Sequence, residues 1–189
     1  TVFFKTEKIS VSFEEGITPK YTVEEVVAVS ELSVGKNMFL TDKKTAINKI
    51  ISAFPYIENA EINILLPDTL NIDVVQAQPT YYVEAGKNNY LVLGRDGRIL
   101  EQNKKITYSI PLIKGVKLEE KGIGEYVEFS EKSFKKILNT VISVAESNEL
   151  SNLDEIDLTQ FSDIKIKYDK RILIVLGTNE NLDYKMRTA

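Results

Sequence analysis

The stretch that decides the fold is PYIENAEINILLPDTLNIDVVQAQP, from Pro55 to Pro79. On either side of its Pro-Asp-Thr centre, apolar residues alternate with polar ones, which is typical of two strands that share one buried face. A one-residue slip would turn one apolar set into water, so the pattern sets the register. It predicts a β-hairpin with a three-residue connection, Pro67 to Thr69, and with three facing pairs: Leu66 with Leu70, Ile64 with Ile72, and Ile62 with Val74.

A strand and two helices are predicted upstream of the hairpin. Alternation from Lys5 to Phe13 indicates a strand. Thr22, with Glu25 three residues later, forms a capping box that opens a helix, and the break at Leu32 to Gly35 follows it. A second helix is expected to begin at Thr41 or Asp42 and to end at Pro55. The predicted order is strand, helix, helix, strand, strand. Its apolar faces comprise Ile9, Val11 and Phe13 in the strand, Val23, Val26 and Val27 in the first helix, and Ala46, Ile47, Ile50, Ile51 and Phe54 in the second.

A second domain is predicted beyond Pro79, because proline ends the hairpin ladder. The expected boundaries are residues 1–77 and 78–189. One long helix, capped by Ser130, carries the apolar residues Phe134, Ile137, Leu138, Val141, Ile142 and Ala145. We therefore predict an α+β protein whose second domain is a mixed, mostly antiparallel sheet with a covering helix. Its strands are expected at Tyr81–Glu84, Tyr90–Leu93, Arg98–Leu100, Ile156–Thr159, Ile164–Tyr168 and Arg171–Leu176, with a tight turn at Asp169-Lys170.

Composition excludes several classes of function. The net charge is −4 and there is no run of basic residues, so neither nucleic-acid binding nor anionic lipid binding is expected. The chain has no cysteine and no histidine, which removes thiolate chemistry and the usual neutral-pH base. The apolar runs are far shorter than the ~20 residues that cross a bilayer. We predict no catalytic residues, no cofactor and no metal.

Three clusters were weighed against a structural role. The acidic residues Asp154, Glu155 and Asp157 suggest a calcium or magnesium site, but they lack a calcium loop's glycine and terminal glutamate, so a solvated loop is favoured. A group of tyrosines could form an aromatic platform that binds carbohydrate or peptide. The favoured alternative is that they pack on a sheet with their hydroxyls in water. The tyrosines concerned are Tyr81, Tyr82, Tyr90 and Tyr108. Gly122-Ile123-Gly124 is a turn rather than a dinucleotide site.

The apolar strand near the C-terminus is the candidate partner-binding site. If it lies at a sheet edge, it can template strand addition by a partner protein. A central strand buried on both faces is an equally good interpretation of the same residues. The candidate residues are Arg171, Ile172, Leu173, Ile174, Val175 and Leu176.

The chain resembles the bacterial cell-division proteins FtsQ and DivIB, whose extracytoplasmic part holds a polypeptide-transport-associated (POTRA) domain and a C-terminal β domain. Each matching segment is weak alone, but together they occur in order and at family-like spacing over nearly the whole chain. Gly94-Arg95 departs from the family's usual aspartate before a turn. The matching segments are Tyr21–Glu25, Gly35–Phe39, Pro55–Ala60, Leu66–Leu70, Tyr90–Leu93, Asp96–Leu100, Ile110–Gly115 and Leu173–Gly177, with Leu182 and Lys185 after them.

The resemblance implies a non-enzymatic scaffold that docks FtsB/DivIC-type and FtsL-type partners and so controls septal peptidoglycan synthesis. It implies a single transmembrane helix upstream of Thr1, with this part on the extracytoplasmic face at the septum. In the family the main docking strand lies beyond the helix near Leu182, so the second domain is expected to be C-terminally incomplete and to bind partners weakly. The alternatives are a POTRA-type chaperone segment of an outer-membrane barrel-assembly or secretion protein and, third, an enzyme.

Overall fold

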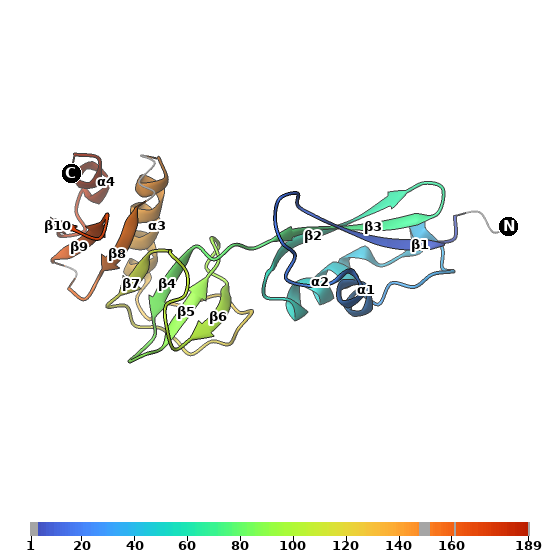
Figure 1. The fold of residues 1–189 in the computed structure, drawn as a ribbon, viewed down its shortest axis with the longest axis horizontal. Coiled ribbons are helices and arrows are strands. Elements are labelled where there is room, and N and C mark those ends of the chain that lie inside the picture. The colour runs from blue at the N-terminus through green and yellow to red at the C-terminus, as the bar shows by residue number, and fades with distance from the viewer. Residues whose placement is uncertain (1–3, 148–151, 161, 189) are drawn as a thin grey trace. The chain divides into compact units, whose positions relative to one another are not determined.

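The computed structural model describes residues 4–147, 152–160 and 162–188 (Figure 1). Its contacts divide the chain into two compact units, Thr1–Gln78 and Pro79–Ala189, here called unit 1 and unit 2. Each unit has its own cluster of buried apolar side chains. The two units are described in turn.

Unit 1 has the predicted order of strand, helix, helix, strand, strand, with a short 3₁₀ turn between the helices. Its three-stranded sheet has the order β1-β3-β2, in which β1 is parallel and β2 antiparallel to β3. Both helices cover the same face of this sheet (Figure 1). The elements are β1 (Lys8–Phe13), α1 (Val23–Ser30), η1 (Met38–Leu40), α2 (Lys43–Ala53), β2 (Ile57–Leu65) and β3 (Thr69–Gln76).

The hairpin between β2 and β3 exists, but its predicted register is wrong by two residues. Ile64 faces Leu70 and Ile62 faces Ile72, while Leu66 lies in the connection with 66% of its surface exposed. The connection has the predicted three residues, but they are Leu66 to Asp68 and include a cis Leu66-Pro67 peptide. A shift of two residues leaves the buried face unchanged, which explains why alternation alone did not distinguish the two registers.

The helix starts of unit 1 agree with the predicted caps. The Thr22 side chain accepts a hydrogen bond from the Glu25 backbone, and the Glu25 carboxylate accepts one from the Thr22 backbone. Asp42 caps α2 by accepting from the Thr45 backbone, and the hydroxyl of Thr45 donates to the same carboxylate. These hydrogen bonds hold the pKa of Asp42 below its usual value. The caps satisfy backbone donors that a helix start otherwise leaves open.

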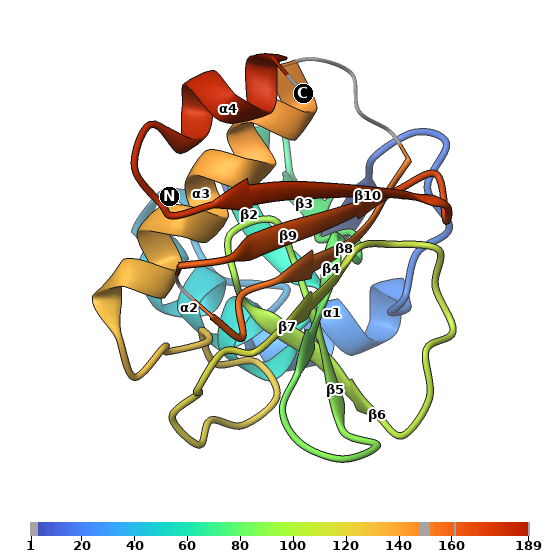
Figure 2. The same cartoon turned by 90° about the vertical axis from the view of Figure 1, so that its left-hand side faces the viewer.

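Unit 2 is a seven-stranded sheet of order β10-β9-β8-β7-β4-β5-β6 (Figure 2). The neighbours β4/β7 and β7/β8 are parallel and the other four pairs are antiparallel, so the predicted mostly antiparallel sheet is confirmed. Its elements are β4 (Tyr81–Glu84), β5 (Tyr90–Leu93), β6 (Ile99–Asn103), β7 (Leu112–Lys114), α3 (Lys132–Ser147), β8 (Leu153–Asp157), β9 (Ile164–Tyr168), β10 (Ile172–Gly177) and α4 (Leu182–Thr188).

Helix α3 connects the parallel strands β7 and β8 and packs on the sheet through its apolar stripe. The predicted cap is wrong, because the helix begins at Lys132 and Glu131 separates it from Ser130. The stripe is confirmed at the buried residues Phe134, Ile137, Leu138 and Val141, to which the structure adds Val144. The side chain of Ala145 lies outside the described residues. The α+β class predicted from the sequence is confirmed.

Candidate partner-binding edge

Strand β10 lies at one edge of the seven-stranded sheet (Figure 2). Its only sheet neighbour among the described residues is β9, so its other side presents backbone donors and acceptors to whatever lies beside it. The interpretation of this strand as central and buried on both faces is wrong. The sequence alone did not distinguish an edge strand from a central strand, because an apolar run occurs in both.

The side chains of β10 are apolar on both faces of the sheet. Leu173 is 63% exposed and Val175 59% exposed on one face, while Leu176 is buried on the other and Ile174 is half-buried. Each exposed residue has a lysine as its cross-strand neighbour on β9: Lys167 faces Leu173, and Lys165 faces Val175. With Ile172, which is 44% exposed, the strand carries three exposed aliphatic side chains and no charge of its own, so it lacks the usual protection against strand pairing.

A cavity of about 210 Å³ lies beside β10 on the opposite face. Its walls come from β8, β9 and β10 and from Met186 of α4, and they are almost entirely apolar. Leu153 and Met186 were not predicted as parts of this site, although the spacing of Leu182 and Met186 on one helix face was a signal. Its lining residues are Leu153, Ile166, Tyr168, Ile172, Ile174, Leu176 and Met186.

Arg171 lies outside the strand. The connection between β9 and β10 consists of Asp169, Lys170 and Arg171, one residue more than the predicted tight turn. Asp169 and Lys170 both have a positive φ, at 49° and 56°. The Arg171 guanidinium lies 2.9 Å from the Asp169 carboxylate, at a position that is well exposed.

The acidic residues 154–157 do not form a metal site. Asp154 accepts a hydrogen bond from the Lys170 backbone at 2.5 Å, and Glu155 pairs with Lys114 at 2.7 Å. Asp157 accepts from the Thr159 backbone, and the hydrogen bonds from Thr159 keep the pKa of Asp157 below its usual value. Within the described ranges there is no group of three or more His, Cys, Asp or Glu side chains that could hold a metal ion. These residues lie on β8 rather than in the predicted loop.

The tyrosines of unit 2 pack against the sheet, which is the interpretation favoured from the sequence, but their hydroxyls are not all in water. Tyr82 is fully buried, and its hydroxyl accepts hydrogen bonds from the backbone of Thr107 and Tyr108. The Tyr108 hydroxyl donates to Glu101 at 2.8 Å. Burial, together with the nearby charge of Asp96, raises the pKa of Tyr81 to about 12. The tyrosines therefore anchor the 104–110 loop to the sheet instead of forming an open platform.

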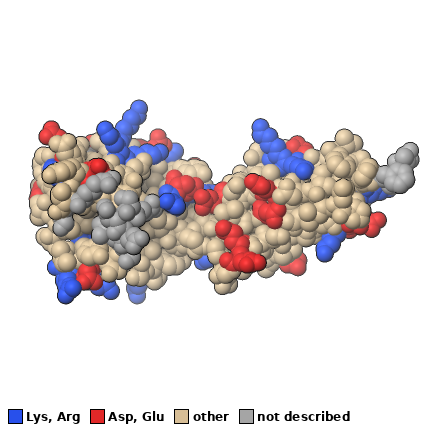
Figure 3. Space-filling view, turned by 90° about the horizontal axis from the view of Figure 1, so that it is seen from above, with Lys and Arg blue, Asp and Glu red and all other residues tan. Residues whose placement is uncertain are grey.

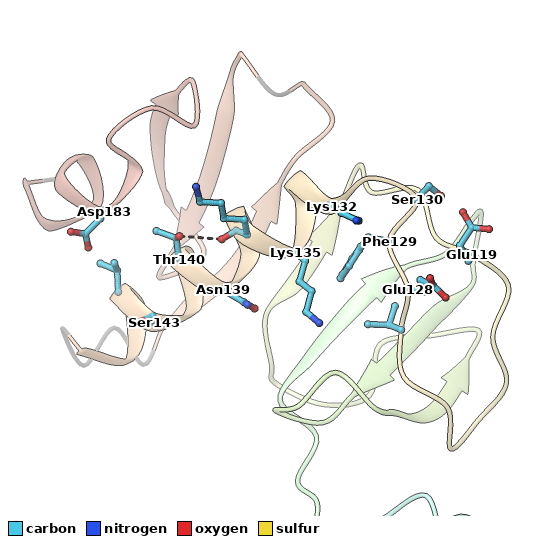
Figure 4. Close-up of a pocket in the computed structure, with 13 residues that line it drawn as sticks. Glu119, Glu128, Phe129, Ser130, Lys132, Lys135, Asn139, Thr140, Ser143 and Asp183 are labelled. Atoms are coloured by element: carbon cyan, nitrogen blue, oxygen red, sulfur yellow. Dashed lines mark hydrogen bonds between the residues drawn. The ribbon is translucent and has the colours of Figure 1, made fainter.

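A wide depression of about 1070 Å³ runs along the outer side of α3 (Figure 4). Its labelled side chains come from α3, from the segment before this helix and from Asp183 of α4, and they do not converge on one point. Glu128 pairs with Lys121 at 3.0 Å, which raises the pKa of Lys121, and Thr140 donates to the Lys136 carbonyl. The depression carries charged and polar groups but no activated nucleophile among its lining residues.

Charges of both signs are interspersed over the face seen in Figure 3. This distribution agrees with the absence of a basic run in the sequence and gives no sign of a nucleic-acid surface. Among the residues that the structure describes, none of the helices combines the length and the hydropathy required to cross a bilayer.

Comparisons with known proteins agree with the architecture. The family profile "POTRA domain, FtsQ-type" matches residues 4–76. The chain is similar to the cell division protein DivIB of Clostridium botulinum strain Hall, with 30% identity over 190 residues, 99% of this chain and 71% of that protein. It is 27% identical over 168 residues to DivIB of Clostridium acetobutylicum, which covers 88% of this chain and 66% of that protein. It is 31% identical over 98 residues to the cell division protein FtsQ of Chloroflexus aurantiacus, which covers 52% of this chain and 34% of that protein.

These names denote cell division and none of them denotes a reaction. The profile matches unit 1, and the similarity to the clostridial protein extends through unit 2. The chain belongs to the DivIB/FtsQ family of cell division proteins.

Proposed function

We propose that this chain is a non-enzymatic scaffold of the divisome that docks partner proteins by strand addition at β10. The partners are of the FtsB/DivIC and FtsL types, and their recruitment controls septal peptidoglycan synthesis. The observation that carries the proposal is the position of β10 at the sheet edge with Leu173 and Val175 exposed. The proposed contact residues remain those predicted from the sequence, Arg171 to Leu176.

Strand addition at this edge uses two features of the site. The backbone of β10 supplies hydrogen bonds that give affinity without regard to sequence, and pockets for alternate side chains give specificity. Every second side chain of an added strand would lie over the apolar cavity next to Ile172 and Ile174. We therefore infer that the partner segment is an extended strand with apolar residues at alternate positions.

The chain acts, in this proposal, on the extracytoplasmic face of the cell membrane at the division septum. Unit 1 corresponds to the POTRA domain next to a single membrane helix upstream of Thr1, and unit 2 corresponds to the β domain that docks partners. Support comes from the family profile on residues 4–76 and from the names of the relatives. The same names favour cell division over the barrel-assembly alternative.

The test is an NMR titration of the chain with the extracytoplasmic segments of a DivIC-type and an FtsL-type partner. Leu173→Lys places a charge on the exposed face of β10, where lysine opposes strand pairing. We expect the dissociation constant to rise at least about tenfold, the range of an interface anchor residue. The control is Ile123→Lys, because Ile123 is a similarly exposed aliphatic residue of unit 2 at 54% and lies outside β10.

Chemical shift changes should map to β10 and to the cavity beside it. Equal losses of affinity in Leu173→Lys and Ile123→Lys, or shift changes that leave β10 unaffected, would count against docking at this edge. Circular dichroism of each variant establishes that the fold is retained before binding is compared.

A further inference from the structure

Exposed apolar side chains gather at one end of unit 1. Among the described residues of this unit, eight large hydrophobic side chains are at least a third exposed. Two of them, Val23 and Val75, lie elsewhere. The other six are Phe4 (49%), Val34 (60%), Phe39 (56%), Leu40 (84%), Leu65 (50%) and Leu66 (66%). Single exposed apolar residues are normal, but six at one end of an 80-residue unit require an explanation.

Three segments that are distant in sequence form this end, and backbone hydrogen bonds join them. The Thr6 N–H donates to the Lys36 carbonyl at 2.9 Å, and the Gly35 N–H donates to the Thr6 carbonyl at 2.8 Å. The Glu7 N–H donates to the Asp68 carbonyl at 2.8 Å. We call the end built by residues 4–8, 34–40 and 65–68 the apolar tip. In Figure 1 it includes the β2–β3 connection and lies next to the label N.

The rings of Phe4 and Phe39 pack edge to face at the tip, with their centroids 5.1 Å apart. This contact, with the Met38 N–H donating to the Phe4 carbonyl at 3.0 Å, holds both aromatic residues in place while leaving about half of each exposed. The tip is therefore a fixed surface of aromatic and aliphatic side chains.

Lysines surround these apolar side chains. Lys5, Lys8 and Lys36 are exposed on the tip itself, and Lys43 and Lys44 follow at the start of α2. The tip itself holds three lysines and two carboxylates, and the adjoining residues 41–44 add two lysines and one carboxylate, in a chain whose net charge is −4. These lysines do not form a basic run because they come from separate segments that only the fold brings together.

We propose that the apolar tip binds a membrane surface that contains anionic lipid, with its aromatic and leucine side chains at the boundary between headgroups and acyl chains. Apolar side chains flanked by lysine are the combination that gives interfacial binding, because burial and attraction to anionic headgroups add. The lysine stems reach outward to the headgroups while the apolar residues penetrate. The proposal differs from the expectation from composition, which rested on the lack of a run of basic residues in the sequence.

The shape of the tip favours a lipid surface over a partner helix. A helix docks in an apolar groove, but the depression next to the tip is lined mostly by polar side chains, including Ser30, Ser33, Asp42 and Thr45. Leu40, the most exposed of the six at 84%, lies at the rim of this depression, where Leu32 and Ala46 are the only other apolar lining residues. Protruding side chains enter a bilayer interface without needing a complementary cavity.

The test uses the absence of tryptophan from the chain. Leu40→Trp places a single fluorophore on the tip, at a residue whose exposure makes the substitution compatible with folding. With vesicles of phosphatidylglycerol and phosphatidylcholine in equal parts, we expect a blue shift of its emission and quenching by lipids brominated on their acyl chains. Leu173→Trp, 63% exposed on β10 of unit 2, is the matched control and should show neither effect.

The charge contribution is tested in the Leu40→Trp background. Lys36→Glu should weaken partitioning into the mixed vesicles about fivefold or more, since one lysine near an anionic surface contributes about that factor. Lys87→Glu, an exposed lysine of unit 2, makes the same change in net charge and should leave partitioning unchanged. Partitioning should also fall when salt is added, because salt screens the headgroup charge.

Several outcomes would overturn the proposal. No blue shift with vesicles, an equal shift of both tryptophans, or equal effects of the two lysine substitutions would each exclude a specific lipid surface at the tip. A blue shift of Leu40→Trp that depends on protein concentration without vesicles would assign the tip to self-association instead. Partner docking at β10 uses other residues, so either result leaves the test of that edge unaffected.

Discussion

At the scale of single residues, Gly115 is the glycine whose added Cβ would meet the closest contacts among the glycines compared. Its φ is +76°, and a Cβ built on it would lie 2.2 Å from the Thr159 backbone nitrogen and 2.4 Å from the Thr159 Cα. The backbone of the segment after β7 therefore passes directly against the segment after β8, where only glycine fits. This gives a physical reason for the glycine that ends the family-like segment Ile110–Gly115.

Gly115→Ala should destabilise the protein by more than about 2 kcal/mol, because backbone cannot move aside as a flexible side chain can. The matched control is Gly177→Ala, at a φ of +68° with nothing within 4 Å of the added Cβ. Gly177→Ala forces an alanine into a left-handed conformation without a clash, so it should lower the free energy of unfolding by about 1 kcal/mol. Urea unfolding of both variants measures the difference, and similar losses would show that conformation alone accounts for the effect.

A second prediction at this scale concerns Tyr81 and the stability of the protein at alkaline pH. Burial raises the folded pKa of Tyr81 to about 12, above the usual tyrosine value of 10.0. Below pH 10 the hydroxyl is neutral in both states, so the full stability is present. Between pH 10 and 12 the unfolded chain loses this proton while the folded chain retains it, so stability falls.

Tyr81→Phe removes this titration. The difference in unfolding free energy between parent and variant should therefore change with pH over this window, by on the order of 2 kcal/mol at pH 12, as two pKa units imply. Urea unfolding at a series of alkaline pH values measures it. Tyr184→Phe, at a residue that is 68% exposed, is the matched control for the loss of a tyrosine hydroxyl. A constant difference between Tyr81→Phe and the parent across the window would show that the hydroxyl is not protected from ionisation.

At the scale of elements, the sequence predicted the existence of most helices and strands better than their ends, but it did not predict the short strand β7 (Leu112–Lys114). The start of α1 was predictable because a capping box fixes it through local hydrogen bonds between Thr22 and Glu25. The start of α3 was not, because the helix begins at Lys132 and the Ser130 N–H donates to the carbonyl of Lys117, a residue far away in sequence. A cap made within one turn can be predicted from sequence, whereas backbone contacts to distant segments cannot.

In the candidate site, too, contacts between distant segments could not be predicted from the sequence. An apolar run from Ile172 to Leu176 predicts a strand correctly, but whether a second strand covers its far side depends on the sheet order. The cavity next to it needs side chains from β8, β9 and α4, whose proximity has no local signal. The chemistry of the site, backbone and apolar side chains only, followed from the lack of cysteine and histidine.

At the scale of the whole molecule, the division into two units is the feature with measurable energetic consequences. Unit 1 buries Ile72 in a core made with α1 and α2, and unit 2 buries Ile156 in a core made with α3. The two clusters share no residue. The order of strands in unit 2 could not be predicted, because β7 inserts between β4 and β8 through parallel pairs that join distant segments.

Because each core is separate, we expect each unit to unfold on its own. Ile72→Ala and Ile156→Ala are matched substitutions of fully buried isoleucines, at 0% and 1% exposure. Each should cost about 2–5 kcal/mol, but only within its own unit. Amide hydrogen exchange, read separately from β3 and from β8 in mild denaturant, measures the two stabilities in one sample. If Ile72→Ala accelerates exchange in β8 as much as in β3, the two units unfold as a single cooperative body, and a substitution that weakens the apolar tip would then also weaken the edge at β10.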